Sequence, residues 1–141
     1  MKSLFIWIFL LVVVAGAAVV VIGGGRSPES TAEAFMHALD SKNIDELIRL
    51  GHFETPPEDL REQWDHCLNV AAKNYVYVWY FERTRETVAG RAAVLVMFVV
   101  YSGPKGTELP EPIELPLIET KEGWRVNMDE MPRKFFPFLP Q

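Results

Sequence analysis

The first part of the chain carries an unbroken apolar pattern. Nineteen residues without charge run from Leu4 to Ile22, and a helix of that length spans roughly 28 Å, about the hydrocarbon thickness of a bilayer. Trp7 stands near one end, where an indole ring anchors at the membrane interface. Gly16 lies among alanines, and such small residues allow helices to approach closely. The pattern predicts a membrane-spanning helix within residues 1–26, ending in a glycine linker.

This segment has a second interpretation as a cleaved secretory signal. Lys2 supplies a minimal basic start, and residues 15–17 (Ala-Gly-Ala) resemble a cleavage site. Five more apolar residues, 18–22, would then remain as a hydrophobic stub. We therefore expect an uncleaved signal anchor.

The charges that flank the span indicate its orientation. Lys2 and the α-amino group stand on one side, whereas Arg26 on the other side is soon followed by Glu29 and Glu33. Basic residues favour the cytoplasmic side. We expect a single-pass protein of the cell (inner or cytoplasmic) membrane whose C-terminal domain lies outside the cytoplasm.

Three helical patterns follow the linker. The first begins at Ser27, a hydroxyl cap followed by proline, and its apolar residues recur every three or four positions until about Asp40. A short helix, 44–50, is capped by Asn43 or Asp45 and stops at Gly51. A third helix is predicted over 57–73, with an apolar stripe of Leu60, Trp64, Cys67, Leu68 and Ala71.

The period then changes from helix to strand. Aromatic and β-branched residues predict strands over 75–87 and 91–101, joined by a turn at Ala89–Gly90. Two more strands are predicted over 111–120 and 124–128. Because Pro112 and Pro116 lack the N–H that a ladder needs, 111–120 is expected at an edge of the sheet. Helices followed by an antiparallel meander indicate an α+β domain, 27–130, with a Pro/Phe-rich tail, 131–141.

Composition narrows the functional classes. Beyond residue 26 the chain carries 12 basic and 19 acidic side chains and one cysteine. This balance argues against nucleic-acid binding and against attraction to anionic lipid, and a single cysteine makes no internal disulfide. We expect no cofactor and no metal site.

The order of elements resembles the NTF2-like (cystatin-like cone) superfamily. The matching positions are Ala32, Phe35, Ala38, Leu39 and Asn43 near the domain start, and Gly123, Trp124, Arg125 and Val126 in its last strand. The resemblance covers 27–130 and implies three helices packed on a curved antiparallel sheet of about four strands. Small membrane-tethered or secreted members of unknown function are most similar.

The resemblance also implies where chemistry would be found. SnoaL-like cyclases and related enzymes place titratable pairs inside the cone, and the candidates in this sequence are His37, His52, Asp65, His66, Cys67 and Asp129. Helical spacing points His37 and His66 to solvent and Cys67 to the core. Only His52 is free to point into a cone mouth. No acid–base pair is implied by spacing, so we expect no enzyme.

The strands point instead to protein binding. Alternation places Tyr75, Tyr77, Trp79 and Phe81 on one face of the first strand, yet the opposite face is apolar too. With Phe98 and Tyr101 of the next strand, these aromatic residues are the candidate partner contacts, because a sheet packed on helices should be polar on its other face. We expect a binding or scaffold module, either an accessory subunit of a membrane complex or a homodimer. Two alternatives stay open: the tail covers the sheet, or the cone holds a small hydrophobic ligand or an active site.

Overall fold

The computed structural model describes residues 25–73, 75–102, 111–133, 136 and 138–141. For residues 75–77, 85–87, 97–102 and 111 only the backbone is described. The predicted span, 4–22, lies outside these residues. Among the helices that the structure describes, none is long and apolar enough to cross a membrane.

The first described helix, α2 (Pro28–Asp40), begins where the capping pattern predicts. The Ser27 hydroxyl accepts a hydrogen bond from the Ser30 amide at 3.2 Å, and proline occupies the first turn. Its inward face buries Ala32, Phe35, Met36, Ala38 and Leu39. This apolar face seats α2 on the sheet.

The next helix leads directly into a strand that the sequence did not reveal. Helix α3 (Ile44–Leu50) is capped by Asn43, whose side-chain oxygen accepts from the Glu46 amide at 3.2 Å. After it, β1 (Gly51–His52) pairs in parallel with the last strand of the sheet. The helix stops at Gly51 as expected, and the same residue begins β1, a strand of two residues that has no periodicity to detect.

The third helix is shorter and less regular than expected. Helix α4 (Leu60–His66) starts three residues after the predicted position and continues as a π-helical turn, η1 (Cys67–Ala71). The Asp59 carboxylate accepts from the Gln63 side chain at 2.8 Å. It therefore caps no helical amide. Within the stripe predicted for this helix, Trp64, Cys67 and Leu68 are buried.

In the described part of the chain the sheet has five strands, one more than expected, in the order β1-β5-β4-β3-β2. It is mixed, because β1 is parallel to β5 and the other pairs are antiparallel. Its long strands are β2 (Tyr75–Val88), β3 (Arg91–Ser102), β4 (Glu111–Thr120) and β5 (Gly123–Asn127). A 3-10 turn, η3 (Met128–Glu130), follows. Gly90, at φ 76°, makes the predicted β2–β3 turn.

The prediction that 111–120 forms an edge strand is wrong, although the half of the strand that contains the prolines pairs on one side only in the described part of the chain. Strand β4 lies between β3 and β5. Its pairing with β5 begins only at Leu117, however, whereas Pro112 and Pro116 pair with β3 alone. The two prolines are four residues apart, so their nitrogens face the same side. That side has no strand partner in the described part of the chain, which is why β4 accommodates both.

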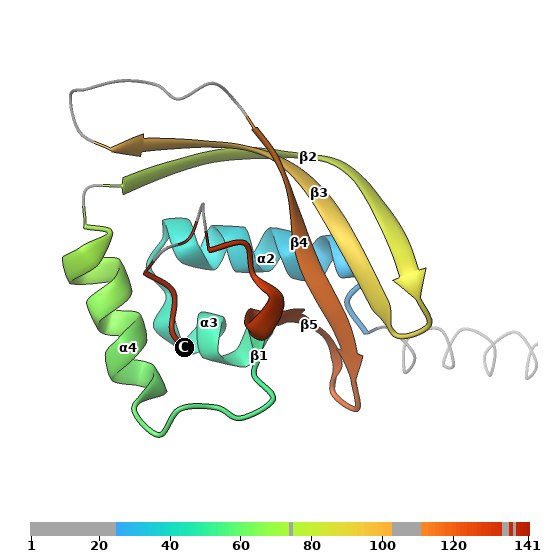
Figure 1. Cartoon of the computed structure of the whole chain (residues 1–141), viewed down its shortest axis with the longest axis horizontal. Coiled ribbons are helices and arrows are strands. Elements are labelled where there is room, and N and C mark those ends of the chain that lie inside the picture. Colours follow the sequence, from blue (N-terminus) through green and yellow to red (C-terminus); the bar gives the residue numbers. More distant parts are fainter. Residues whose placement is uncertain (1–24, 74, 103–110, 134–135, 137) are drawn as a thin grey trace, which may run out of the picture.

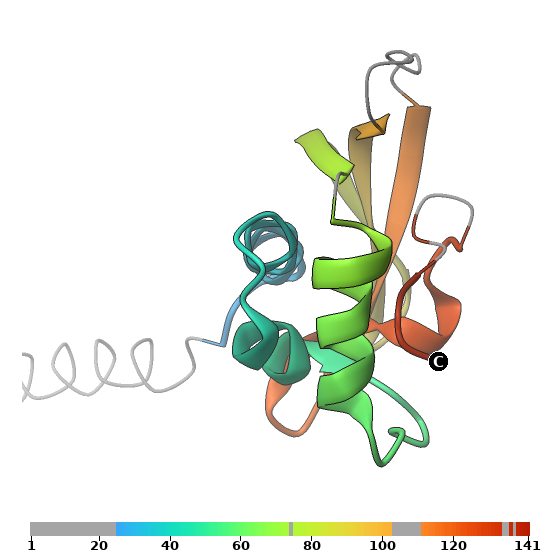
Figure 2. The ribbon, with the colours of Figure 1, turned by 90° about the vertical axis from the view of Figure 1, so that its left-hand side faces the viewer.

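The helices pack against one side of a sheet that curves around α2 (Figures 1 and 2). Helix α2 contacts β2, β3, β4 and β5. Alternate residues of the strands point to the helices, among them Val94, Val96, Ile113, Leu115 and Leu117, all buried. The sheet therefore has an inner face that contributes to the core and an outer face directed away from the helices.

The C-terminal tail belongs to the same core rather than to a separate segment. Met131, Phe136 and Leu139 are buried in the cluster that also holds the helices. The Arg133 guanidinium donates to the carbonyls of Leu139 and Pro140 at 2.7 and 2.9 Å. From η3 the tail crosses toward α4 (Figure 1), where the Gln141 amide donates to Gln63 at 3.0 Å. The described tail thus packs beside α4 and leaves the outer face of β2 exposed.

We expect Phe136→Ala to lower the free energy of unfolding by about 3–5 kcal/mol, because Phe136 is fully buried and its loss leaves a cavity. Phe138→Ala is the matched control, since Phe138 is 40% exposed and should cost less than about 1 kcal/mol. Urea denaturation followed by circular dichroism measures both. Equal, small effects would show that the tail is not part of the core.

Candidate functional site

In the described part of the chain, no hydrogen bond or ion pair joins two of the residues considered for acid–base chemistry. His37 is exposed on α2, with Nε2 3.9 Å from a Glu33 oxygen and its ring 5.0 Å from that of Trp79. Asp65 is exposed on α4 and accepts from Asn69 at 2.9 Å. Asp129 accepts from the Glu54 amide at 2.8 Å. This contact ties the loop before α4 to η3, so Asp129 acts as a structural acceptor.

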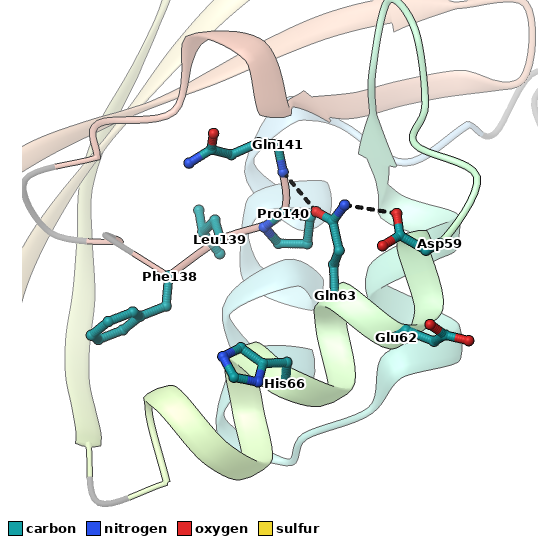
Figure 3. Close-up of a pocket in the computed structure, with 8 residues that line it drawn as sticks. All are labelled: Asp59, Glu62, Gln63, His66, Phe138, Leu139, Pro140 and Gln141. Atoms are coloured by element: carbon teal, nitrogen blue, oxygen red, sulfur yellow. Dashed lines mark hydrogen bonds between the residues drawn. The ribbon is translucent and has the colours of Figure 1, made fainter.

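His66 borders a surface groove between α4 and the tail (Figure 3). The groove has a volume of about 530 Å³, and its walls are Asp59, Glu62, Gln63, His66 and residues 138–141. Gln63 spans its floor by donating to Asp59 and accepting from the Gln141 amide. His66 is exposed, as predicted, and a hydrogen-bonded amide instead of a base occupies the centre of the groove.

Cys67 is buried at the junction of α4 and η1. Burial in an apolar environment raises the pKa of its thiol to about 11, although the nearby Arg133 charge opposes the shift. The thiolate is the nucleophilic and metal-binding form, so this cysteine is inert near neutral pH. Its predicted role as a small buried hydrophobe is consistent with this environment.

Large side chains of the described residues are buried between the helices and the sheet. Trp64 and Phe35 meet edge to face with ring centroids 6.3 Å apart, and both are fully buried. Phe136 and Met128 are equally enclosed. No group of three or more histidine, cysteine or acidic side chains is placed to hold a metal ion among the described residues.

His52, the histidine expected at the mouth of the cone, lines a pocket next to the sheet. It is half-buried in β1, and this second pocket, of about 470 Å³, has as its other walls Ile48, Arg49, Gly51, Thr120, Lys121, Glu122 and Arg125. These residues come from α3, β1 and the β4–β5 hairpin. The pocket is therefore basic, although the domain as a whole is acidic.

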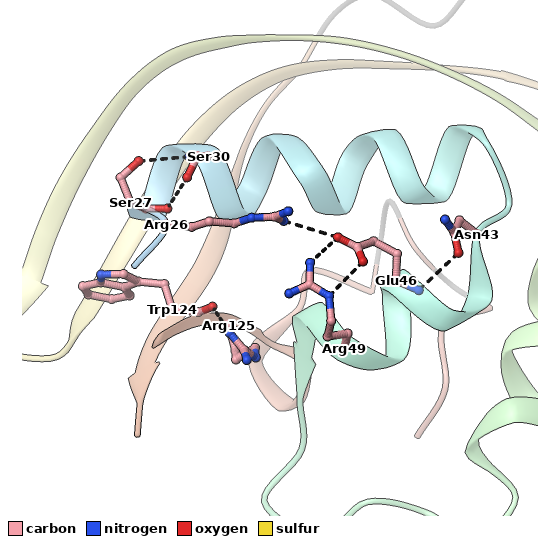
Figure 4. Close-up of polar contacts among 8 residues, drawn as sticks. All are labelled: Arg26, Ser27, Ser30, Asn43, Glu46, Arg49, Trp124 and Arg125. Atoms are coloured by element: carbon pink, nitrogen blue, oxygen red, sulfur yellow. Dashed lines mark hydrogen bonds and ion pairs between the residues drawn. The ribbon is translucent and has the colours of Figure 1, made fainter. Parts of the chain in front are cut away.

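Next to this pocket, ion pairs connect the chain before α2 to α3 (Figure 4). Glu46 accepts from Arg49 through both carboxylate oxygens and from Arg26 at 3.3 Å. The hydrogen bonds from Arg49 hold the pKa of Glu46 below its ordinary value. The carboxylate thus stays ionised and positions both arginines.

Two of the candidate partner contacts, Trp79 and Phe81, lie on the inner face of the sheet and not on its outer face. Trp79 and Phe81 are half-buried, pack against the core and touch each other with ring centroids 5.3 Å apart. They point inward. The other set of β2 points outward, with Val78 48% and Tyr80 59% exposed. Because both sets are apolar, the sequence could not tell which one the helices would cover.

The other partner candidates cannot be placed in this way. The side chains of Tyr75, Tyr77, Phe98 and Tyr101 are outside the described part of the structure. The span residues Leu4, Trp7, Gly16 and Ile22 also lie outside the described residues. In the first half of β2, the exposed apolar side chains that the structure describes are Val78 and Tyr80.

Comparison of the sequence with family models and with curated proteins gives no match. One solved structure that matches part of this chain is a ketosteroid isomerase-like protein from Erwinia carotovora atroseptica SCRI1043. It is 17% identical, with a TM-score of 0.46, and the match covers 70% of this chain and 86% of that chain. Similarity at this level assigns neither a family nor an activity.

The buried thiol predicts a pH dependence of stability. Since its pKa is raised on folding from an ordinary 9.0 to about 11, the folded state retains the proton that the unfolded state loses. The stabilisation that the buried neutral thiol contributes to the free energy of unfolding is complete below pH 9 and is lost as pH rises toward 11. We expect the wild type to lose about 2 kcal/mol more over this range than Cys67→Ala, measured by urea unfolding at each pH. Parallel curves for the two chains would contradict the prediction.

Proposed function

We propose that this chain is a single-span protein of the cell membrane whose extracytoplasmic domain is a non-catalytic binding module with an NTF2-like cone. It serves as an accessory subunit that docks another membrane protein or a second copy of itself. The observation that carries the proposal is the apolar, exposed outer side of β2.

The membrane part of the proposal is supported by the sequence. The run from Leu4 to Ile22 matches the thickness of a bilayer. Residue 25 and Arg26, the first described residues after it, lead straight into α2. The domain would thus lie close to the membrane surface, because each extended residue adds at most about 3.6 Å.

The binding part is supported by the packing of the domain. The interior that an enzyme of this type would use for substrate is occupied by Phe35, Trp64 and Phe136. Of the candidate acid–base residues, Cys67 is buried, and no two of the set are hydrogen-bonded to each other among the described residues. These observations favour a binding module over the alternatives, an enzyme or a carrier of a small hydrophobic ligand.

Strand β2 supplies the docking surface. It ends the sheet, and in the described part of the chain it is hydrogen-bonded only to β3. Its first seven residues, 75–81, carry no charge, whereas Glu82 and Arg83 follow with a shift in register. Charges and bulges are the usual protection of an edge strand against pairing. The first half of β2 lacks the charges, and its outward Val78 and Tyr80 extend the apolar surface.

The anchor predicts the behaviour of the chain in fractionated membranes. We expect the wild type to stay in the pellet after alkaline carbonate extraction. Val13→Arg should move most of the protein to the supernatant, because a charge at the centre of a span costs about 2.5–3.5 kcal/mol. Wild-type protein found in the supernatant would disprove the anchor.

The docking surface predicts the mass of the native assembly. In gentle detergent we expect the wild type in a complex heavier than one chain plus its micelle. Val78→Glu should weaken that complex at least roughly tenfold, since a carboxylate would be buried without a partner. Native mass spectrometry measures the result.

Val70→Glu is the matched control. Val70 is 61% exposed on η1, away from the sheet, so this variant introduces the same charge at a similarly exposed valine. It should leave the complex intact. A wild type that is monomeric, or a Val78→Glu complex as stable as the wild type, would disprove docking through β2.

A further inference from the structure

The basic pocket brings together cations that are far apart in the chain. Arg49 stands at the end of α3, and Lys121 and Arg125 belong to the β4–β5 hairpin. All three line the same pocket, beside half-buried His52. No run of basic residues in the sequence announces this cluster.

The nearby acidic groups do not cancel these charges. Glu46 is shared between two arginines, Arg49 and Arg26. Glu122 is 83% exposed and 3.6 Å from Arg125, so water screens that pair. In and beside the pocket, the cationic side chains are those of Arg26, Arg49, Lys121 and Arg125, and the carboxylates are those of Glu46 and Glu122. This local excess of positive charge lies in a domain whose overall charge is negative.

Arg125 has hydrogen-bond donors that its contacts with the described residues do not satisfy. Its side chain is only 15% exposed, and a guanidinium carries five donors. One terminal nitrogen donates to the Trp124 carbonyl at 2.9 Å (Figure 4). Among the described residues, its one carboxylate contact is the long one to Glu122. A buried arginine favours a planar, bidentate oxyanion as its partner.

We propose that this pocket binds a phosphate group. Arg125 supplies a guanidinium at the wall, Arg49 and Lys121 supply charge from the two sides, and His52 supplies an imidazole. Arginine and lysine together satisfy the charge and the hydrogen-bonding capacity of a phosphate.

The position of the pocket favours a lipid headgroup as the source of the phosphate, and this part rests on the membrane anchor proposed above. Arg26 lies four residues beyond Ile22, hence within about 14 Å of the end of the span. Through Glu46 it adjoins Arg49 at the pocket wall. Free phosphate has the same chemistry and reaches the pocket without any membrane.

The experiment uses the full chain in non-ionic detergent and follows its thermal unfolding midpoint in two arms. One arm titrates inorganic phosphate against chloride at equal ionic strength. The other adds phosphatidylglycerol or, as the zwitterionic control, phosphatidylcholine to the micelles. We expect phosphate and phosphatidylglycerol to raise the midpoint. Arg49→Gln with Lys121→Gln should weaken the apparent affinity by roughly tenfold or more, because charged hydrogen bonds are lost.

Lys73→Gln with Arg83→Gln is the matched control, since it removes the same two charges from exposed positions elsewhere. It should retain the wild-type response. The single variant Lys121→Gln, at an exposed turn, serves if the double variant is unstable.

A response to phosphate alone assigns the pocket to free phosphate, and a response to phosphatidylglycerol alone assigns it to the headgroup. No response to either, or equal responses in the wild type and the pocket variant, would overturn the proposal. The phosphate arm does not depend on the anchor, so a failed anchor and a failed pocket give different results.

Discussion

The contact between Phe35 of α2 and Trp64 of α4 is the constraint on which the domain depends. The two rings meet edge to face with full burial of both side chains, an arrangement that aromatic pairs prefer. It locks the helices to each other and to the inner face of the sheet. The tail adds Phe136 and Leu139 to the same cluster. The pocket beside β1 is lined by residues outside this cluster.

Three outer surfaces of the described residues differ in chemistry. The groove between α4 and the tail is spanned by the hydrogen bonds of Gln63. The outer side of β2 is apolar, with Val78 and Tyr80 exposed. The pocket beside β1 is basic.

Much of the fold could be predicted because it depends on local signals. Ser27 and Asn43 cap helices as their residue types indicate, and Gly90 makes the turn between two strands. The errors concern features that strand pairing decides. Strand β1 is two residues long, and among the described residues β4 lacks a second strand partner only along its proline-containing half. Neither feature leaves a periodic pattern, because each depends on which strands lie next to it.

The sequence by itself determined the apolar run before the domain, the α+β order, the caps and turns, and the burial of Cys67. These follow from residue spacing and backbone preference, which act over a few residues. The tertiary structure alone decided which apolar face of β2 is covered, since Trp79 and Tyr80 are equally suited to packing. It also decided that the tail completes the core. Finally, it brought Arg49, Lys121 and Arg125 to one pocket, because only the packing of α3 against the β4–β5 hairpin places charges so distant in sequence side by side.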